Sequence, residues 1–146
     1  MKNIIFLITI LCFNVFQSYA QSAFSLKLYA GSNAPWGESQ FVSIDTKGNC
    51  FYSLSEVNKG VKDSSSFKIT SAQMTQLNDL ITKIKFFKLN KTYNEKSRDG
   101  TRLSVEVISG GKNQTVHWVN FHNSESDQLL SKLNTILKTK NISISY

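Results

Sequence analysis

The sequence is poor in cysteine, proline and glycine, the residues that most often cross-link or interrupt a chain. Its 146 residues include two cysteines, one proline and seven glycines. Such a composition excludes a collagen-like chain, a long flexible linker and a disulfide-rich scaffold. Hydrophobic residues make up 40% of the chain, so the fold must rest on a hydrophobic core, and the length fits one domain.

Patterns that carry catalysis or bind metal are also absent from the sequence. There is no G-x-S-x-G motif, no phosphate-binding loop and no dinucleotide fingerprint. The two histidines, His117 and His122, are five residues apart, which places them on opposite faces of a continued strand. A zinc site would need further ligands close to both. We therefore predict no catalytic residue, no metal and no cofactor.

Residues 1–20 have the layout of a secretory signal peptide. Lys2 gives a positive start, residues 4–16 are mostly apolar, and the small residues Ser18 and Ala20 favour cleavage after Ala20. The apolar stretch is shorter than the roughly 20 residues that a membrane-spanning helix needs. We therefore expect residues 21–146 to form a single extracytoplasmic domain, secreted or periplasmic.

Cleavage after Ala20 would leave Cys50 as the one cysteine of the mature chain. An intrachain disulfide is then impossible, and Cys50 is expected to be a buried, inert thiol within a strand. A lipid anchor on Cys12 is not favoured, because Leu11 stands where a lipobox has a small residue.

Positive charge exceeds negative charge along the chain. Lysine and arginine number 17 against 10 aspartate and glutamate residues, a net charge of +7, which loss of Lys2 lowers to +6. This excess would suit an acidic partner such as an anionic lipid or glycan, whereas scattered lysines also serve solubility alone. We expect an unknown protein or envelope component as partner, no nucleic acid, no stable membrane span and a monomer.

Hydrophobic periodicity predicts the order of strands and helices. Alternation of apolar and polar residues predicts strands at 24–29, 40–44, 50–54, 66–70, 101–109 and 114–121, with a last edge strand at 142–146. Helical spacing predicts one helix with Ser71 as its N-cap and a second from Ser124 to Lys140, with Ser124 and Asp127 resembling a capping box. The fold class is therefore α+β: a single domain with an antiparallel β-sheet and two amphipathic helices packed on one face.

Three apolar residues follow the first predicted helix. Phe86, Phe87 and Leu89 come directly after its last turn. We expect this segment to fold back and to pack its apolar side chains against the core.

Two loops are candidate partner-binding sites. Residues 31–37 hold Pro35 and Trp36, and a tryptophan in such a loop is either a lid on the core or an exposed anchor for a partner. Residues 90–100 hold Tyr93 and Arg98 in a polar, predominantly basic stretch. The first loop is the leading candidate and the second loop is the next.

The order of turn and packing residues resembles a family of small secreted bacterial domains of unknown function. The residues that carry the likeness are Phe41 to Asp45 with Gly48 and Tyr52, Ile69 to Gln73, Phe86 to Leu89, Asp99 to Thr101, and Gly110 with Gly111. A fainter likeness is to emfourin, an inhibitor of thermolysin-like metalloproteases, although no inhibitory residue can be matched. This second resemblance implies a protein-binding module.

These observations predict an exported, non-catalytic binding domain of unknown ligand, and the emfourin resemblance would make it inhibitor-like. Two alternatives stay open. One is a hydrolase whose site is assembled from dispersed Asp, Glu and His residues, such as Asp45, Asp63, Glu38 and Glu106. The other is a cell-envelope protein that binds anionic glycan or lipid through its lysines.

Overall fold

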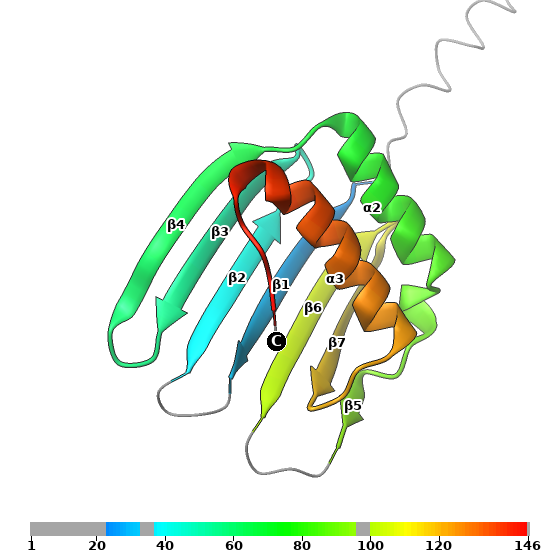
Figure 1. Cartoon of the computed structure of the whole chain (residues 1–146). Helices are drawn as coiled ribbons and strands as arrows, with labels where there is room; N and C mark the ends of the chain where they lie inside the picture. The colour runs from blue at the N-terminus through cyan, green and yellow to red at the C-terminus, as the bar shows by residue number, and fades with distance from the viewer. Residues whose placement is uncertain (1–22, 33–36, 96–99, 146) are drawn as a thin grey trace, which may run out of the picture.

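The structure, a computed structural model, describes residues 23–32, 37–95 and 100–145. One seven-stranded sheet runs through the molecule in the order β4-β3-β2-β1-β6-β7-β5 (Figure 1). The strands are β1 (Ser25–Ser32), β2 (Glu38–Ile44), β3 (Asn49–Glu56), β4 (Gly60–Lys68), β5 (Thr92–Asn94), β6 (Thr101–Ser109) and β7 (Lys112–Val119). Neighbouring strands are antiparallel except for β5, which pairs parallel with β7.

In the part of the chain that the structure describes, two helices and two short 3₁₀ turns accompany the sheet. These are α2 (Ser71–Lys83), η1 (Phe86–Lys88), α3 (Ser124–Leu137) and η2 (Lys138–Lys140). Both helices lie on the same face of the sheet (Figure 1), so the predicted α+β fold is confirmed. Within the described residues, no helix is long and apolar enough to cross a membrane.

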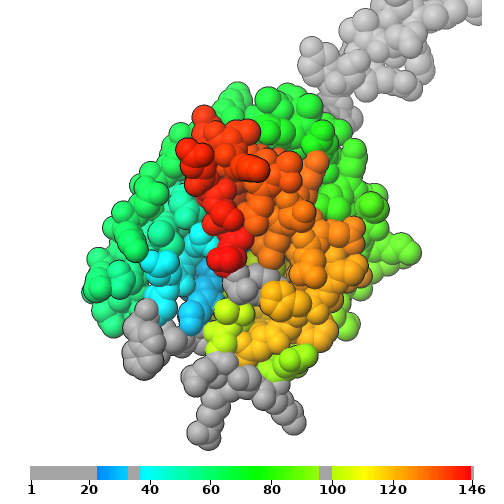
Figure 2. Space-filling model, in the orientation of Figure 1, coloured from blue at the N-terminus to red at the C-terminus, as the bar shows by residue number. Residues whose placement is uncertain are grey.

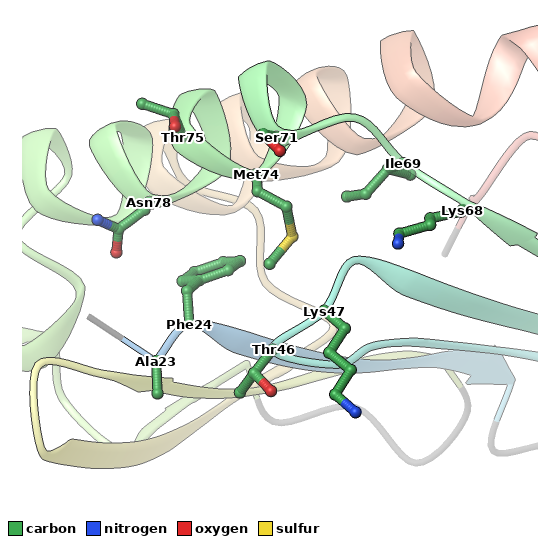
Figure 3. A pocket seen from close by; sticks show the side chains of 10 residues that line it. All are labelled: Ala23, Phe24, Thr46, Lys47, Lys68, Ile69, Ser71, Met74, Thr75 and Asn78. Atoms are coloured by element: carbon green, nitrogen blue, oxygen red, sulfur yellow. The ribbon is translucent and has the colours of Figure 1, made fainter. Parts of the chain in front are cut away.

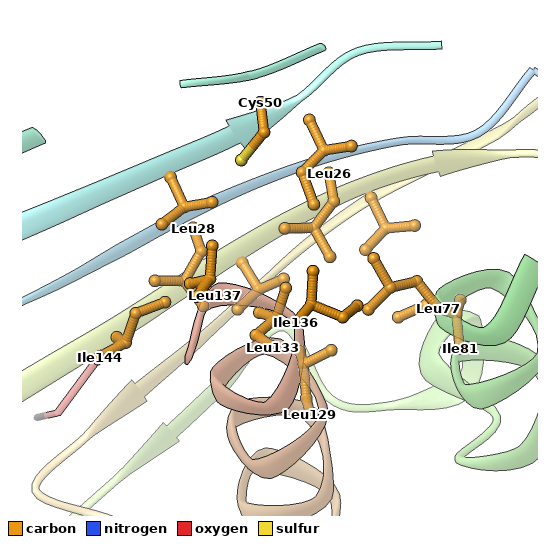
Figure 4. Packing of buried hydrophobic residues seen from close by; sticks show 14 of the residues in the cluster. Leu26, Leu28, Cys50, Leu77, Ile81, Leu129, Leu133, Ile136, Leu137 and Ile144 are labelled. Atoms are coloured by element: carbon orange, nitrogen blue, oxygen red, sulfur yellow. The ribbon is translucent and has the colours of Figure 1, made fainter. Parts of the chain in front are cut away.

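The helices and the sheet enclose one hydrophobic core. In β1, Leu26 and Leu28 are buried, whereas Lys27 and Tyr29 are exposed, which is the alternation expected of a strand with one buried face. Apolar side chains of α3, among them Leu133, point toward the leucines of β1 (Figure 4). Figure 2 shows α3 and the C-terminal segment covering the middle of this side of the molecule.

The segment after α2 packs as predicted, but its two phenylalanines are not equivalent. Phe86 is fully buried, whereas Phe87 is only partly buried. The two rings meet edge to face with centroids 5.8 Å apart, and the amine of Lys112 lies 5.9 Å from the Phe87 ring centroid. Phe86 is therefore the core residue, and Phe87 covers it from outside.

Both helices are capped one residue earlier than the sequence predicts. Thr70, not Ser71, caps α2: its Oγ1 accepts from the Gln73 amide at 3.1 Å, and Gln73 Oε1 accepts from the Thr70 amide at 2.8 Å. At α3, Asn123 and Ser126 form the same reciprocal pair. The N-cap needs an extended backbone and a side-chain oxygen that reaches the third helical amide. Thr70 and Asn123 meet both conditions.

Three segments differ from the predicted strands. Strand β4 begins at Gly60 rather than at residue 66, and β5 lies within the predicted polar loop. Residues 142–144 form no strand, yet Ile142 and Ile144 are buried.

Side chains, rather than a sheet ladder, hold the C-terminal segment. Asn134 accepts from the Ile144 amide at 2.7 Å and donates to its carbonyl at 2.9 Å. Gln40 binds the segment in the same two-way manner, donating to the Ser143 carbonyl and accepting from the Ser145 amide. These amide side chains satisfy backbone groups that a strand partner would otherwise pair.

Candidate functional site

No described helix covers the second face of the sheet, which we call the uncovered face. It is formed by the strand residues that alternate with the buried ones. Among them are Lys27, Tyr29, Phe41, Ser43, Phe51, Ser53, Ser64, Ser66, Arg102, Ser104, Glu106, Thr115 and His117. An antiparallel sheet commonly leaves one face to solvent, and such a face is then polar.

Three aromatic side chains depart from that rule and lie together on the uncovered face. Tyr29 in β1 stands directly opposite Phe41 in β2, and the rings of Phe41 and Phe51 are 6.4 Å apart at an angle of 53°. The side chains of Tyr29 and Phe51 are large apolar groups left 40% exposed. We call Tyr29, Phe41 and Phe51 the aromatic cluster.

The surroundings of the aromatic cluster are polar but carry little unbalanced charge. Lys27 and Glu106 stand opposite each other in the β1–β6 register and form an ion pair of 3.2 Å. Serine hydroxyls occupy most neighbouring positions, including Ser43 and Ser53, the register partners of Phe51 and Phe41. The surface therefore combines exposed rings with hydroxyl groups that can donate or accept hydrogen bonds.

Three of the four residues proposed from sequence as partner contacts, Pro35, Trp36 and Arg98, lie outside the described residues. The fourth, Tyr93, is in β5 and half-buried. Its ring stacks on Trp118 at 6.0 Å and on Phe121 at 5.5 Å, and its hydroxyl accepts from the Asn90 amide at 3.2 Å. Tyr93 thus packs on the helical side of the sheet, where it attaches β5 to β7.

The residues best suited to chemistry lie apart from one another. Cys50 is buried, and burial raises the pKa of its thiol to about 11, so the thiol is neutral at physiological pH. His117 points to the uncovered face, while His122 Nδ1 lies 3.5 Å from Asp127 Oδ1 beside the start of α3. In the part of the chain that the structure describes, no three His, Cys, Asp or Glu side chains gather in a way that could hold a metal ion.

Three of the four acidic residues considered for a dispersed hydrolase site, Asp45, Glu38 and Glu106, have separate partners. Asp45 accepts hydrogen bonds from Asn49 and from the Lys47 amide, which keep its pKa below the usual value and hold the β2–β3 turn. Glu38 pairs with Lys62 at 2.8 Å, and Glu106 pairs with Lys27 as described above. These three carboxylates are therefore engaged by a turn or by a lysine.

A cavity of about 520 Å³ lies on the helical side, between α2 and the β2–β3 turn (Figure 3). Its lining residues are Ala23, Phe24, Thr46, Lys47, Lys68, Ile69, Ser71, Met74, Thr75 and Asn78. The close approach of the turn depends on Gly48, whose φ is +79° and whose missing β-carbon would lie 3.0 Å from the Ile69 carbonyl.

Neither the aromatic cluster nor this cavity is among the sites predicted from sequence. The signal for the cluster is present in the sequence, because Tyr29, Phe41 and Phe51 occupy the positions of alternating strands where polar residues are expected. Its recognition needs the strand register, which brings the three residues together.

Comparison with known proteins identifies the family but no function. The search of curated proteins finds no match. A family model, described as a domain of unknown function, matches residues 38–139. This range runs from the first residue of β2 to the turn after α3 and covers more than half of the chain. The predicted membership of a family of unknown function is thus confirmed: the chain belongs to the DUF6438 family.

Proposed function

We propose that this protein is an exported, non-catalytic binding domain that holds a protein partner against its uncovered face. The observation that carries the proposal is the exposure of Tyr29 and Phe51 beside Phe41 on a face that no described helix covers. Exposed aromatic side chains on one surface supply a large contact area at a low cost in conformational entropy.

The size of the uncovered face fits a protein partner. The six long strands of the sheet have seven to nine residues each; a spacing of about 4.8 Å and a rise of about 3.3 Å per residue give them a face of about 24 by 26 Å. This corresponds to about 620 Å², a large part of the area of about 800 Å² that each partner contributes to a standard interface. A single small molecule would cover only part of it.

The composition of the face also fits an interface. Interface centres are enriched in aromatic residues and depleted of unpaired charge, and a polar rim surrounds them. Here the aromatic cluster lies on the three consecutive strands β1, β2 and β3, and the adjacent charges of Lys27 and Glu106 are paired. Serine and threonine hydroxyls supply the surrounding polar groups.

Two further parts of the proposal, the non-catalytic role and the export of the protein, rest on separate observations. The raised pKa of Cys50 and the separation of the acidic residues support a non-catalytic role. The signal-like residues 1–20 support export. The emfourin resemblance agrees with a protein partner, and a protease is one form that such a partner could take.

Site-specific crosslinking tests the proposal in cells, where the partner itself is present. The photoreactive residue p-benzoylphenylalanine replaces Phe51 in one variant and Thr135, which is exposed on α3, in a matched control. Both are expressed in the source organism and irradiated. We expect a discrete protein adduct for the Phe51 variant, and little or none for the Thr135 variant.

The purified partner is then titrated with Tyr29→Ala, Phe51→Ala and Thr135→Ala. Each aromatic substitution should weaken binding by about 2 kcal/mol, roughly 30-fold, as expected for a hot-spot residue, while Thr135→Ala leaves affinity unchanged. Equal adduct yields at both positions, or an adduct digested by glycosidase instead of protease, would overturn the proposal.

A further inference from the structure

We infer that the cavity beside α2 is a second binding site, which takes a small organic anion carrying a short apolar part. It lies on the helical side of the sheet, so the inference is independent of the uncovered face. Its volume of about 520 Å³ falls within the range of about 300–1,000 Å³ that is usual for small-molecule sites.

The inner wall of the cavity is apolar. Phe24, Ile69 and Met74 form it, and Figure 3 shows Phe24 and Met74 pointing toward one another from the start of the sheet and from α2. All three are buried residues of the core. A short alkyl or aromatic group placed here would gain burial without disturbing the packing beneath it.

Two cationic side chains line the cavity. Lys47 and Lys68 both line it, and no carboxylate of the described residues does. Within the described residues neither lysine forms an ion pair, whereas Lys27, Lys59 and Lys62 each pair with a glutamate. The nearby Asp45 carboxylate accepts hydrogen bonds from its own turn, and attraction to Lys47 is the smallest of the causes that lower its pKa. The two lysines are therefore available to an external anion.

Neutral hydrogen-bonding groups also line the cavity. Ser71 and Thr75 contribute hydroxyls from α2, and Thr46 contributes one from the β2–β3 turn. Asn78 accepts a hydrogen bond from Ser109 Oγ at 2.7 Å through its Oδ1, which leaves its Nδ2 group as a donor. Donors and cations without a lining carboxylate favour a carboxylate or phosphate ester over a cation or a neutral sugar.

Titration of the isotope-labelled mature protein, followed by NMR, tests the site with defined probes. Hexyl phosphate carries both the charge and the apolar part, inorganic phosphate carries the charge alone, and hexanol carries the apolar part alone. We expect saturable shifts of Met74 and Ser71 with hexyl phosphate, and binding at least about tenfold weaker with either of the other probes.

Two matched double variants give the decisive comparison. Lys47→Gln/Lys68→Gln should weaken hexyl phosphate binding by about tenfold or more, while Lys59→Gln/Lys62→Gln, which changes the net charge equally, should leave it unchanged. Flotation with phosphatidic acid vesicles then identifies the source of the anion. Co-flotation of the protein indicates a lipid headgroup, and its absence indicates a free ester. Equal weakening in both variants, or shifts that do not saturate, would overturn the inference.

Discussion

The ring of Tyr29 lies along its own strand over Gly31. A β-carbon at Gly31 would stand 3.0 Å from Tyr29 Oη and 3.2 Å from Cζ, and 3.0 Å from the β-carbon of Ser39 on β2. An aromatic ring that covers a strand glycine shields the exposed backbone and is held flat against the sheet. Gly31 thus helps to set the orientation of one member of the aromatic cluster.

Gly31→Ala should therefore destabilise the protein, although alanine normally improves on glycine within a strand. We expect a loss of about 1 kcal/mol, measured by urea denaturation, because the new methyl group displaces the Tyr29 ring and crowds Ser39. In a Tyr29→Ala background the loss should be smaller. Additive effects in this double-mutant cycle would show that the ring and the glycine are not coupled.

The two phenylalanines after α2 should respond differently to truncation. Phe86→Ala removes a fully buried ring and should cost about 3–5 kcal/mol of unfolding free energy. Phe87 is partly exposed, so Phe87→Ala should cost clearly less. Chemical denaturation of both variants provides the measurement, and similar losses would mean that Phe87 carries as much of the core as Phe86.

The stability that Cys50 contributes should decrease at alkaline pH. Burial raises its pKa to about 11 from an ordinary value of 9.0, so between these values the unfolded chain loses the proton while the folded chain keeps it. The contribution is therefore fully present below pH 9 and is lost as pH rises toward 11.

The measurement is the difference in unfolding free energy between wild type and Cys50→Ala across this pH range. Lysine and tyrosine titrations are common to both proteins and cancel in the comparison. A difference that stays constant from pH 8 to about pH 11 would contradict the buried-thiol interpretation.

Substitution at the start of α2 distinguishes the observed cap from the predicted one. Thr70→Ala removes the side-chain oxygen that accepts from the Gln73 amide and should cost about 1 kcal/mol. Ser71→Ala changes the first helical residue and should have almost no effect on thermal stability. The reverse order of effects would restore Ser71 as the cap.

Much of the fold follows from patterns that are local in the sequence. The alternation in β1 and the helical spacing in α2 are visible without a structure, because burial of one face imposes a period on a single element. The burial of Phe86 and of Cys50 could be predicted for the same reason: an apolar side chain next to a regular element is stabilised by any core that the element faces.

Elements that depend on a distant partner could not be predicted from sequence. Strand β5 is three residues long and polar at both ends, and it exists because it pairs with β7 while Tyr93 stacks on Trp118. The first half of β4 has no apolar alternation and is ordered by hydrogen bonds to β3. Backbone pairing needs no particular side chain, so it leaves little trace in the sequence.

The aromatic cluster and the cavity show most clearly what the sequence and the tertiary structure each determine. The sequence by itself determined the strands that hold Tyr29, Phe41 and Phe51, and it placed Lys47 in the turn at residues 45–49. Only the tertiary structure decided that both helices cover one face, which leaves Tyr29 and Phe51 exposed and Phe41 partly exposed on the other, and that the β2–β3 turn meets α2 to form a cavity. The physical reason is that periodicity records whether a residue is buried, whereas the choice of covering element depends on packing between segments far apart in the chain.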